Sequence, residues 1–236
     1  MKIDVVGSGC TWTRGLSTSF VINDEILFDV PLGSFKSLMH DYNLEKINYI
    51  IISHFHSDHF NDIHLVLDYI FNRYPNKKLT IIAPNGCFER ICTLFRLIEV
   101  SYLEEYLKDR VEFIVCENGK KFKLGQYDFK CFKMTHGKVD AYGFIIDYNN
   151  VKVGFTGDTA MCNNVHKILK KTKGCFIDCA NVQPNNKHLS VGEVVELSHE
   201  YSDCKLYLVH LSIYSIEQLE KLNIQYPYQG EVINIE

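Results

Sequence analysis

Three histidines and an aspartate lie close together in the segment His54-Phe-His-Ser-Asp-His59, between a short apolar run and an amphipathic stretch. Side chains two apart at the end of an extended strand point the same way, so His54 and His56 should face one side. Asp58 and His59 open the following helix, where the turn can aim both toward the same point. Burying these groups together without a cation would be costly. The segment therefore predicts a divalent metal site rather than a His-rich surface loop.

Three further residues follow apolar strand patterns elsewhere in the chain. Asp158 lies in a Gly-Asp-Thr loop after Val151–Phe155, and His210 follows Leu206–Val209. His136 comes just after another strand pattern. Each alone would be an ordinary loop residue. Because ligands collect at the carboxyl ends of strands in α/β proteins, their shared position predicts one joint site.

The remaining sequence alternates between strand and helix patterns, with no repeat, low-complexity tract or linker. Strands are expected at Ile3–Val6, Ser19–Ile22, Glu25–Asp29, Tyr49–Ile52, Leu79–Ala83, Val111–Cys116, Lys120–Leu124, Tyr127–Met134, Gly143–Tyr148, Val151–Phe155, Cys175–Cys179 and Lys205–His210. Helices are expected at Gly33–Tyr42, His59–Arg73, Gly86–Tyr106, Asn164–Lys171, Val191–Tyr201 and Ser215–Leu222. This order predicts an α/β fold with two mixed sheets and helices outside, as a single domain over residues 1–236.

The order of the candidate ligands resembles the metallo-β-lactamase superfamily, with His-x-His-x-Asp-His, a later His, a Gly-Asp-Thr and a final His. The resemblance covers nearly the whole chain. It implies a four-layer αβ/βα sandwich with a dinuclear metal site at one edge. By position it assigns one metal to His54, His56 and His136 and the other to Asp58, His59 and His210, with Asp158 and a hydroxide bridging them. Zinc suits such imidazole-rich sites, and the carboxylates also allow Mn or Fe.

Within the superfamily the sequence is most similar to RNase Z-type phosphodiesterases. Gly7–Ser19 resembles their Gly-rich opening, Phe28–Gly33 their segment with an Asp and a Gly, and His188-Leu-Ser190 their late His-Ser motif. In that family the late His lies beside the scissile phosphate. The resemblance therefore makes His188 the candidate for substrate contact or proton donation, and Asp58 and His188 are the expected catalytic residues.

Two departures from the RNase Z pattern bear on function. Where the family carries a Glu near its late strand, this chain offers only Asp178. RNase Z enzymes also insert a long arm between the third metal His and the bridging Asp, and they use it to clamp tRNA. Between His136 and Asp158 there is room only for two short strands, so the arm is absent.

Charge also argues against a large anionic substrate. The net charge is −4, which gives no overall attraction to nucleic acid or an anionic membrane. The lysines between Lys120 and Lys138 are interpreted as solvated faces of edge strands in preference to a guide for phosphate. We therefore expect a dinuclear-metal phosphodiesterase that acts on a small phosphodiester through a metal-bridging hydroxide. Nucleic acid is not the favoured partner, no membrane is involved, and a homodimer is compatible with the sequence.

Other functions fit the same motifs. They are an RNase Z-type tRNA 3′-processing endonuclease, a thioester or lactone hydrolase of the same fold, a di-iron oxidoreductase and a non-catalytic metal-binding sensor. The oxidoreductase ranks low, because such relatives usually place a carboxylate where His56 stands and work with a flavin domain.

Weaker patterns concern the compartment and the first loop. None of the nine cysteines forms a C-x-x-C pair, and no apolar run is long enough for a membrane helix, so we expect a reducing cytoplasmic setting. Gly7-Ser-Gly9 follows a strand, but Trp12 occupies the third glycine position of a dinucleotide-binding loop. We expect a tight turn beside the metal site instead.

Overall fold

The computed structural model describes all residues from 1 to 236, and its strands form two mixed sheets. The first sheet has the order β13-β1-β2-β3-β4-β5-β6 and the second the order β12-β11-β10-β9-β8-β7. The strands of the first sheet are β1 (Lys2–Gly7), β2 (Ser19–Ile22), β3 (Ile26–Phe28), β4 (Tyr49–Ile51), β5 (Leu79–Ala83), β6 (Val111–Val115) and β13 (Val232–Asn234). Those of the second are β7 (Lys121–Leu124), β8 (Tyr127–Lys133), β9 (Tyr142–Tyr148), β10 (Val151–Phe155), β11 (Gly174–Asp178) and β12 (Lys205–Val209).

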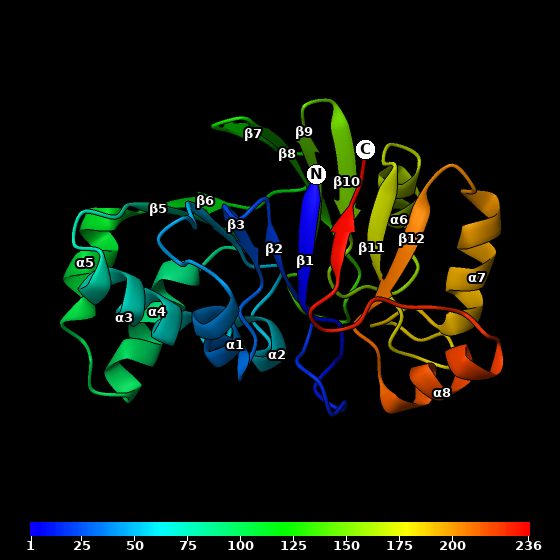
Figure 1. Cartoon of the computed structure of the whole chain (residues 1–236), viewed down its shortest axis with the longest axis horizontal. Coiled ribbons are helices and arrows are strands. Elements are labelled where there is room, and N and C mark those ends of the chain that lie inside the picture. Colours follow the sequence, from blue (N-terminus) through cyan, green and yellow to red (C-terminus); the bar gives the residue numbers. More distant parts are fainter.

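Helices cover the outer faces of the two sheets, which face each other in the middle of the molecule (Figure 1). The first half of the chain contributes α1 (Ser34–Asp41), α2 (Ser57–Phe60), α3 (Ile63–Arg73), α4 (Cys87–Leu97) and α5 (Leu103–Arg110). The second half contributes α6 (Asn163–Leu169), α7 (Val191–Glu200) and α8 (Ile213–Lys221). This is the four-layer αβ/βα sandwich expected from the sequence.

Three buried clusters hold the layers together, and β4 shows how one strand serves two of them. Ile50 packs in the cluster between the first sheet and its helices, whereas Ile51 packs in the cluster between the sheets. A strand buried on both faces needs a continuous apolar run, which is the pattern the sequence shows here. Aromatic rings fill the space between the sheets, where Phe155 and Phe176 stack with their centroids 5.1 Å apart. The third cluster joins the second sheet to α6, α7 and α8.

The structure corrects two expected helices and adds one strand. The helix expected over His59–Arg73 is two helices, because the chain turns at Asn61–Asp62 and the Asp62 carboxylate accepts the backbone N–H of Phe35. The helix expected over Gly86–Tyr106 also breaks after Leu97, where Glu99 adopts a φ of 63°. The short strand β13, which has only one buried residue, has too weak a pattern to be recognised from sequence.

The cysteines and the lengths of the helices bear on two smaller expectations. All nine cysteines are free thiols, and eight of them are buried. Buried thiols of this kind behave as small apolar side chains. None of the helices combines the length and apolar character needed to cross a bilayer.

Candidate metal centre

The predicted ligands converge at the edge of the sandwich where several strands end. His54 and His56 follow β4, and α2 carries Asp58 and His59 in its single turn. The other three ligands, His136, Asp158 and His210, follow β8, β10 and β12. Gly157, with a φ of +57°, turns the chain into the site, and a Cβ there would lie 3.0 Å from the carbonyl oxygen of Tyr142.

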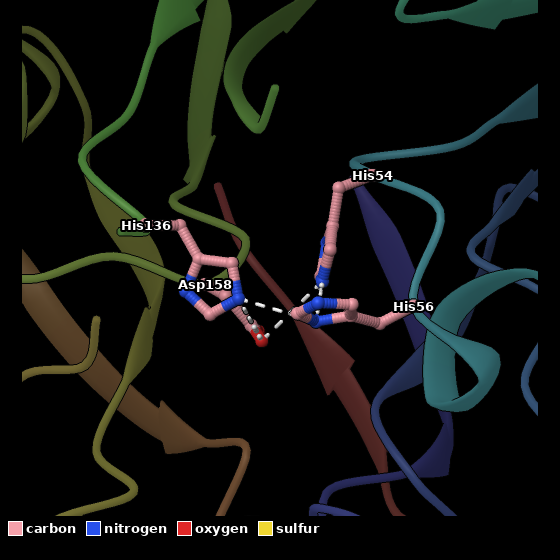
Figure 2. Close-up of side chains that lie close together, drawn as sticks. All are labelled: His54, His56, His136 and Asp158. Carbon is pink, nitrogen blue, oxygen red and sulfur yellow. Dashed lines mark hydrogen bonds and ion pairs between the residues drawn. The ribbon is translucent and has the colours of Figure 1, made fainter. Parts of the chain in front are cut away.

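Three imidazoles and one carboxylate form the first ligand group (Figure 2). The Nδ1 atom of His56 lies 2.9 Å from Nε2 of His54 and 3.2 Å from Nε2 of His136. The Oδ2 atom of Asp158 lies 3.6 Å from Nε2 of His54 and 3.8 Å from Nε2 of His136. Four potential ligand atoms therefore surround one point.

The second ligand group shares Asp158 with the first. Nε2 of His210 lies 3.3 Å from Oδ2 of Asp58 and 3.3 Å from Oδ2 of Asp158. Nε2 of His59 lies 3.3 Å from Oδ1 of Asp158 and 3.8 Å from Oδ2 of Asp58. Asp158 thus presents one oxygen to both groups and the other to His59, as a bridging ligand would.

Unpartnered buried atoms test whether these residues suit metal ions. Nε2 of His59 and Oδ1 of Asp158 are both buried and have no hydrogen-bond partner, although they face each other. Buried polar atoms without partners are rare in folded proteins, and such atoms call for an explanation. Imidazole nitrogen and carboxylate oxygen are the ligands that Zn²⁺ takes in catalytic sites. The residues present therefore fit a pair of divalent ions.

A buried carboxylate, Asp29, orients the second ligand group. It accepts the backbone N–H and the hydroxyl of Ser53, each at 2.7 Å, and it lies 2.7 Å from Nδ1 of His59. The proton on Nδ1 of His59 leaves Nε2 free for a metal. In the first group the backbone oxygen of Lys187 accepts from Nδ1 of His136 at 2.8 Å and has the same effect.

The histidines of the two groups differ in the direction of their pKa shifts when no metal is bound. Burial lowers the pKa values of His54, His56 and His136, which keeps these rings in the neutral form that binds metal. Burial also opposes the charge on His59, but Asp158 and Asp29 outweigh it and raise the pKa of His59 to about 10. The pKa of His210 is raised in the same way, chiefly by Asp158.

His188 lies beside both groups without belonging to the expected ligand set. Its Nδ1 lies 2.9 Å from Oδ2 of Asp178 and 4.0 Å from Oδ2 of Asp158. The ring stacks on that of His210, with centroids 5.0 Å apart, and its side chain remains 19% exposed. Asp178 also accepts the backbone N–H of Thr159 at 2.8 Å. Asp178 therefore occupies the position beside the late His, although the family pattern has a Glu near that strand.

The first loop braces the final ligand. His210 adopts a φ of 57°, which is unfavourable for a residue with a Cβ. Its backbone N–H donates to the hydroxyl of Thr18 at 2.9 Å. The loop is joined to the same segment by the bond from Cys10 N–H to the Leu211 oxygen and by that from Leu211 N–H to the Ser8 oxygen. The tight turn expected at Gly7-Ser-Gly9 is not there, because Gly7 ends β1 and Gly9 pairs with Ser17 and Leu211; the chain turns instead after Cys10, whose carbonyl oxygen accepts from Thr13 N–H at 3.2 Å.

Two of these supporting residues have roles that sequence reasoning did not assign. Asp29 follows strand β3 and so shows the same strand-end signal that identified Asp158 and His210. It could have been found by that rule. Thr18 could not, because its side chain meets His210 only through the pairing of distant segments.

Comparison with known proteins decides the family. The family model described as Anti-Pycsar protein Apyc1 matches residues 1–225. The chain belongs to this family. It is also similar to the ribonuclease Z of Staphylococcus saprophyticus, with 29% identity over 127 residues, covering 53% of this chain and 40% of that protein. The match therefore spans less than half the length of that curated relative.

Solved structures agree on the fold. The metallo-β-lactamase fold protein YhfI from Bacillus subtilis superimposes with a TM-score of 0.78 and 18% identity, covering 98% of each chain. The short form of human tRNase Z superimposes with a TM-score of 0.77 and 19% identity, covering 100% of each chain. Both the metallo-β-lactamase fold and the likeness to the RNase Z branch, expected from the sequence motifs, are confirmed.

Proposed function

We propose that this protein is a metal-dependent hydrolase, and specifically a dinuclear-metal phosphodiesterase that acts on a small phosphodiester. The observation that carries the proposal is the position of Asp158 between two groups of three ligands. A site that holds two ions side by side is suited to stabilising both the attacking and the leaving oxygen of a phosphoryl displacement.

The ligand assignment follows the two groups. His54, His56 and His136 would hold one ion, Asp58, His59 and His210 the other, and Asp158 both. Zn²⁺ is the metal we propose first, because five of these seven ligands are imidazoles. When bound, the ions would polarise the phosphoryl oxygens and lower the pKa of a bound water.

His188 is the side chain placed to handle a proton. Its hydrogen bond to Asp178 fixes the ring through Nδ1, which leaves Nε2 available for the substrate. Partial exposure allows a substrate to reach the ring, while stacking on His210 holds it beside the ligand groups. We propose that His188 contacts the scissile phosphate and protonates the departing oxygen.

The short segment between His136 and Asp158 supports a small substrate. Only β9 and β10 occupy this interval, and they join through the two residues Asn149 and Asn150. No protruding element is present to grip a folded RNA. The net charge of −4 also gives little attraction for a large polyanion.

A metal and substrate panel tests the proposal. Protein purified without chelator should contain two equivalents of transition metal and should hydrolyse bis(p-nitrophenyl) phosphate or a cyclic nucleotide. The variant His56→Ala should lose one ion and turnover together, whereas His199→Ala, which changes an exposed histidine of α7, should match the wild type. Less than one equivalent of metal after reconstitution would overturn the site, and turnover of thioesters or lactones alone would overturn the phosphodiesterase assignment.

The sequence similarity to curated relatives favours a second candidate function, tRNA 3′ processing, because those relatives are named ribonuclease Z. The same panel includes a precursor tRNA at catalytic enzyme levels. Efficient trimming that falls steeply with salt would support this candidate, since many phosphate contacts release many counterions. Turnover of small diesters that survives moderate salt would support the first.

A further inference from the structure

The outer face of strands β7 to β10 carries one row of charges that is balanced. Lys123, Asp128, Asp147 and Lys152 lie opposite one another across these four strands. Each lysine is therefore next to an acid, and Nζ of Lys152 lies 3.6 Å from Oδ2 of Asp147. The row also places Asp128 directly opposite Asp147, but each aspartate has a lysine opposite it on its other side, so the four charges cancel and this row needs no ligand to explain it.

The next row along the same strands has no acid. Lys121 lies directly opposite Lys130, and the row continues through Ile145 to Gly154. Lys171 adds another positive charge from the segment after α6. Lys121, Lys130 and Lys171 make no ion pair. Like charges directly opposite each other destabilise a sheet, so the row is unfavourable as it stands.

These lysines surround a hollow. It has a volume of about 770 Å³, and five lysines line it together with both acids of the balanced row: Lys121, Lys123, Lys130, Lys152 and Lys171. Burial is the largest cause that lowers the pKa of Lys130, and the positive charges of Lys171 and Lys121 lower it further. The hollow lies on the face of the second sheet away from the first, because the alternate residues Ile146 and Val153 point into the cluster between the sheets. It shares no residue with the metal centre.

We infer that Lys121, Lys130 and Lys171 form an anion site for a short chain of phosphoryl groups, either inorganic or part of a nucleotide. Lysine ammonium groups bind phosphate as mobile point charges, and several acting together match an anion with adjacent phosphates. Asp128 and Asp147 line the same hollow and are balanced by Lys123 and Lys152, so the unbalanced positive charge is confined to these three lysines. The ligand is therefore compact, and an extended nucleic acid strand does not fit this arrangement of charges.

Calorimetric titration of the metal-loaded protein tests the site with two probes, inorganic tripolyphosphate and ATP. We expect binding of tripolyphosphate to weaken at least about tenfold in the double variant Lys130→Gln/Lys171→Gln, because two of the three charges are lost. The variant Lys205→Gln removes an exposed lysine from the same sheet but outside the hollow and should bind like the wild type. Equal affinity for both probes would identify the phosphates as the recognised group, and tighter binding of ATP would add a contribution from the nucleoside.

Two results would overturn the inference. One is tripolyphosphate binding that is equally tight in the wild type and the double variant. Binding at the metal centre would also give this result, because the double variant leaves that centre intact. The other is a melting temperature of unliganded Lys130→Gln well below that of the wild type, because removing an unrelieved charge should leave stability unchanged or raised. Hydrolysis of bis(p-nitrophenyl) phosphate should be unchanged in Lys130→Gln and in the double variant Lys130→Gln/Lys171→Gln. Failure here would therefore leave the proposed phosphodiesterase activity standing.

Discussion

The two ligand groups of the metal centre differ in how they are supported. In the first, His54 and His136 face neutral groups on their outer sides, the hydroxyl of Ser53 and the backbone oxygen of Lys187. In the second, His59 faces the buried carboxylate of Asp29, and Nδ1 of His210 lies 3.7 Å from Oδ1 of Asp178. One group is thus supported by dipoles and the other by full charges.

Negative charge is concentrated around the second group. The first group has only the shared Asp158 as a carboxylate ligand, whereas the second adds Asp58 and is backed by Asp29 and Asp178. A carboxylate behind a ligating imidazole raises its basicity and fixes its orientation. We therefore expect the second group to hold its ion more tightly, and to depend more on residues outside the ligand set.

The largest effect is expected from the residue that the groups share. Asp158→Asn should remove both ions and lower hydrolysis by about 10⁴-fold or more, since each ion contributes several kcal/mol. Metal analysis and turnover of bis(p-nitrophenyl) phosphate check this, with Asp147→Asn on the outer sheet face as the matched control. Retention of two ions in Asp158→Asn would contradict the bridging role.

Separate substitutions in the two groups should separate the ions. His56→Ala and Asp58→Ala should each lower turnover by about 10³-fold, because a dinuclear mechanism needs both ions. Elemental analysis should find about one equivalent remaining in each case, held more tightly in His56→Ala, where the second group is intact. If both variants retained their remaining ion with equal affinity, the comparison between the groups would fail.

His188 is predicted to act on substrate rather than on metal. His188→Ala should keep both ions and lower kcat by about 10²-fold, the lower range for loss of a general acid. The control is His166→Ala, since His166 bonds to Tyr201 far from the ligand groups. Unchanged kcat in His188→Ala would remove the proposed proton donor, and loss of metal would instead make His188 a ligand.

The smallest effect on metal affinity is expected from Asp29, which supports the second group without belonging to it. Asp29→Asn should weaken that ion by about tenfold, the lower end for residues that orient a ligand, and leave the first ion unchanged. Competition with a zinc chelator measures the two affinities. Equal weakening of both ions would show that Asp29 supports the whole strand end through Ser53 and not His59 in particular.

Sequence reasoning could predict the ligands better than their supports, and the reason is physical. Five of the seven candidate ligands follow strands and two open the next helix, and each has a residue type suited to metal, so pattern and chemistry coincide. Asp178 is the last residue of the buried strand β11, and only the structure shows that its carboxylate reaches His188. The backbone oxygen of Lys187 has no sequence signature at all. Likewise, a break such as that at Glu99 depends on local backbone geometry that helix patterns do not encode.

The left-handed backbone of His210 bears on the order in which this protein can fold. That conformation is rare in an unfolded chain for a residue with a Cβ, and here a hydrogen bond from the His210 N–H to the hydroxyl of Thr18, 192 positions earlier, helps to hold it. The ligands themselves come from four separate parts of the sequence, beginning at His54 and ending at His210. Closing such long loops is slow, because the entropy must be lost before the contacts form. The complete metal centre is therefore a late product of folding, and ions bound to it would stabilise only chains in which both halves have already met.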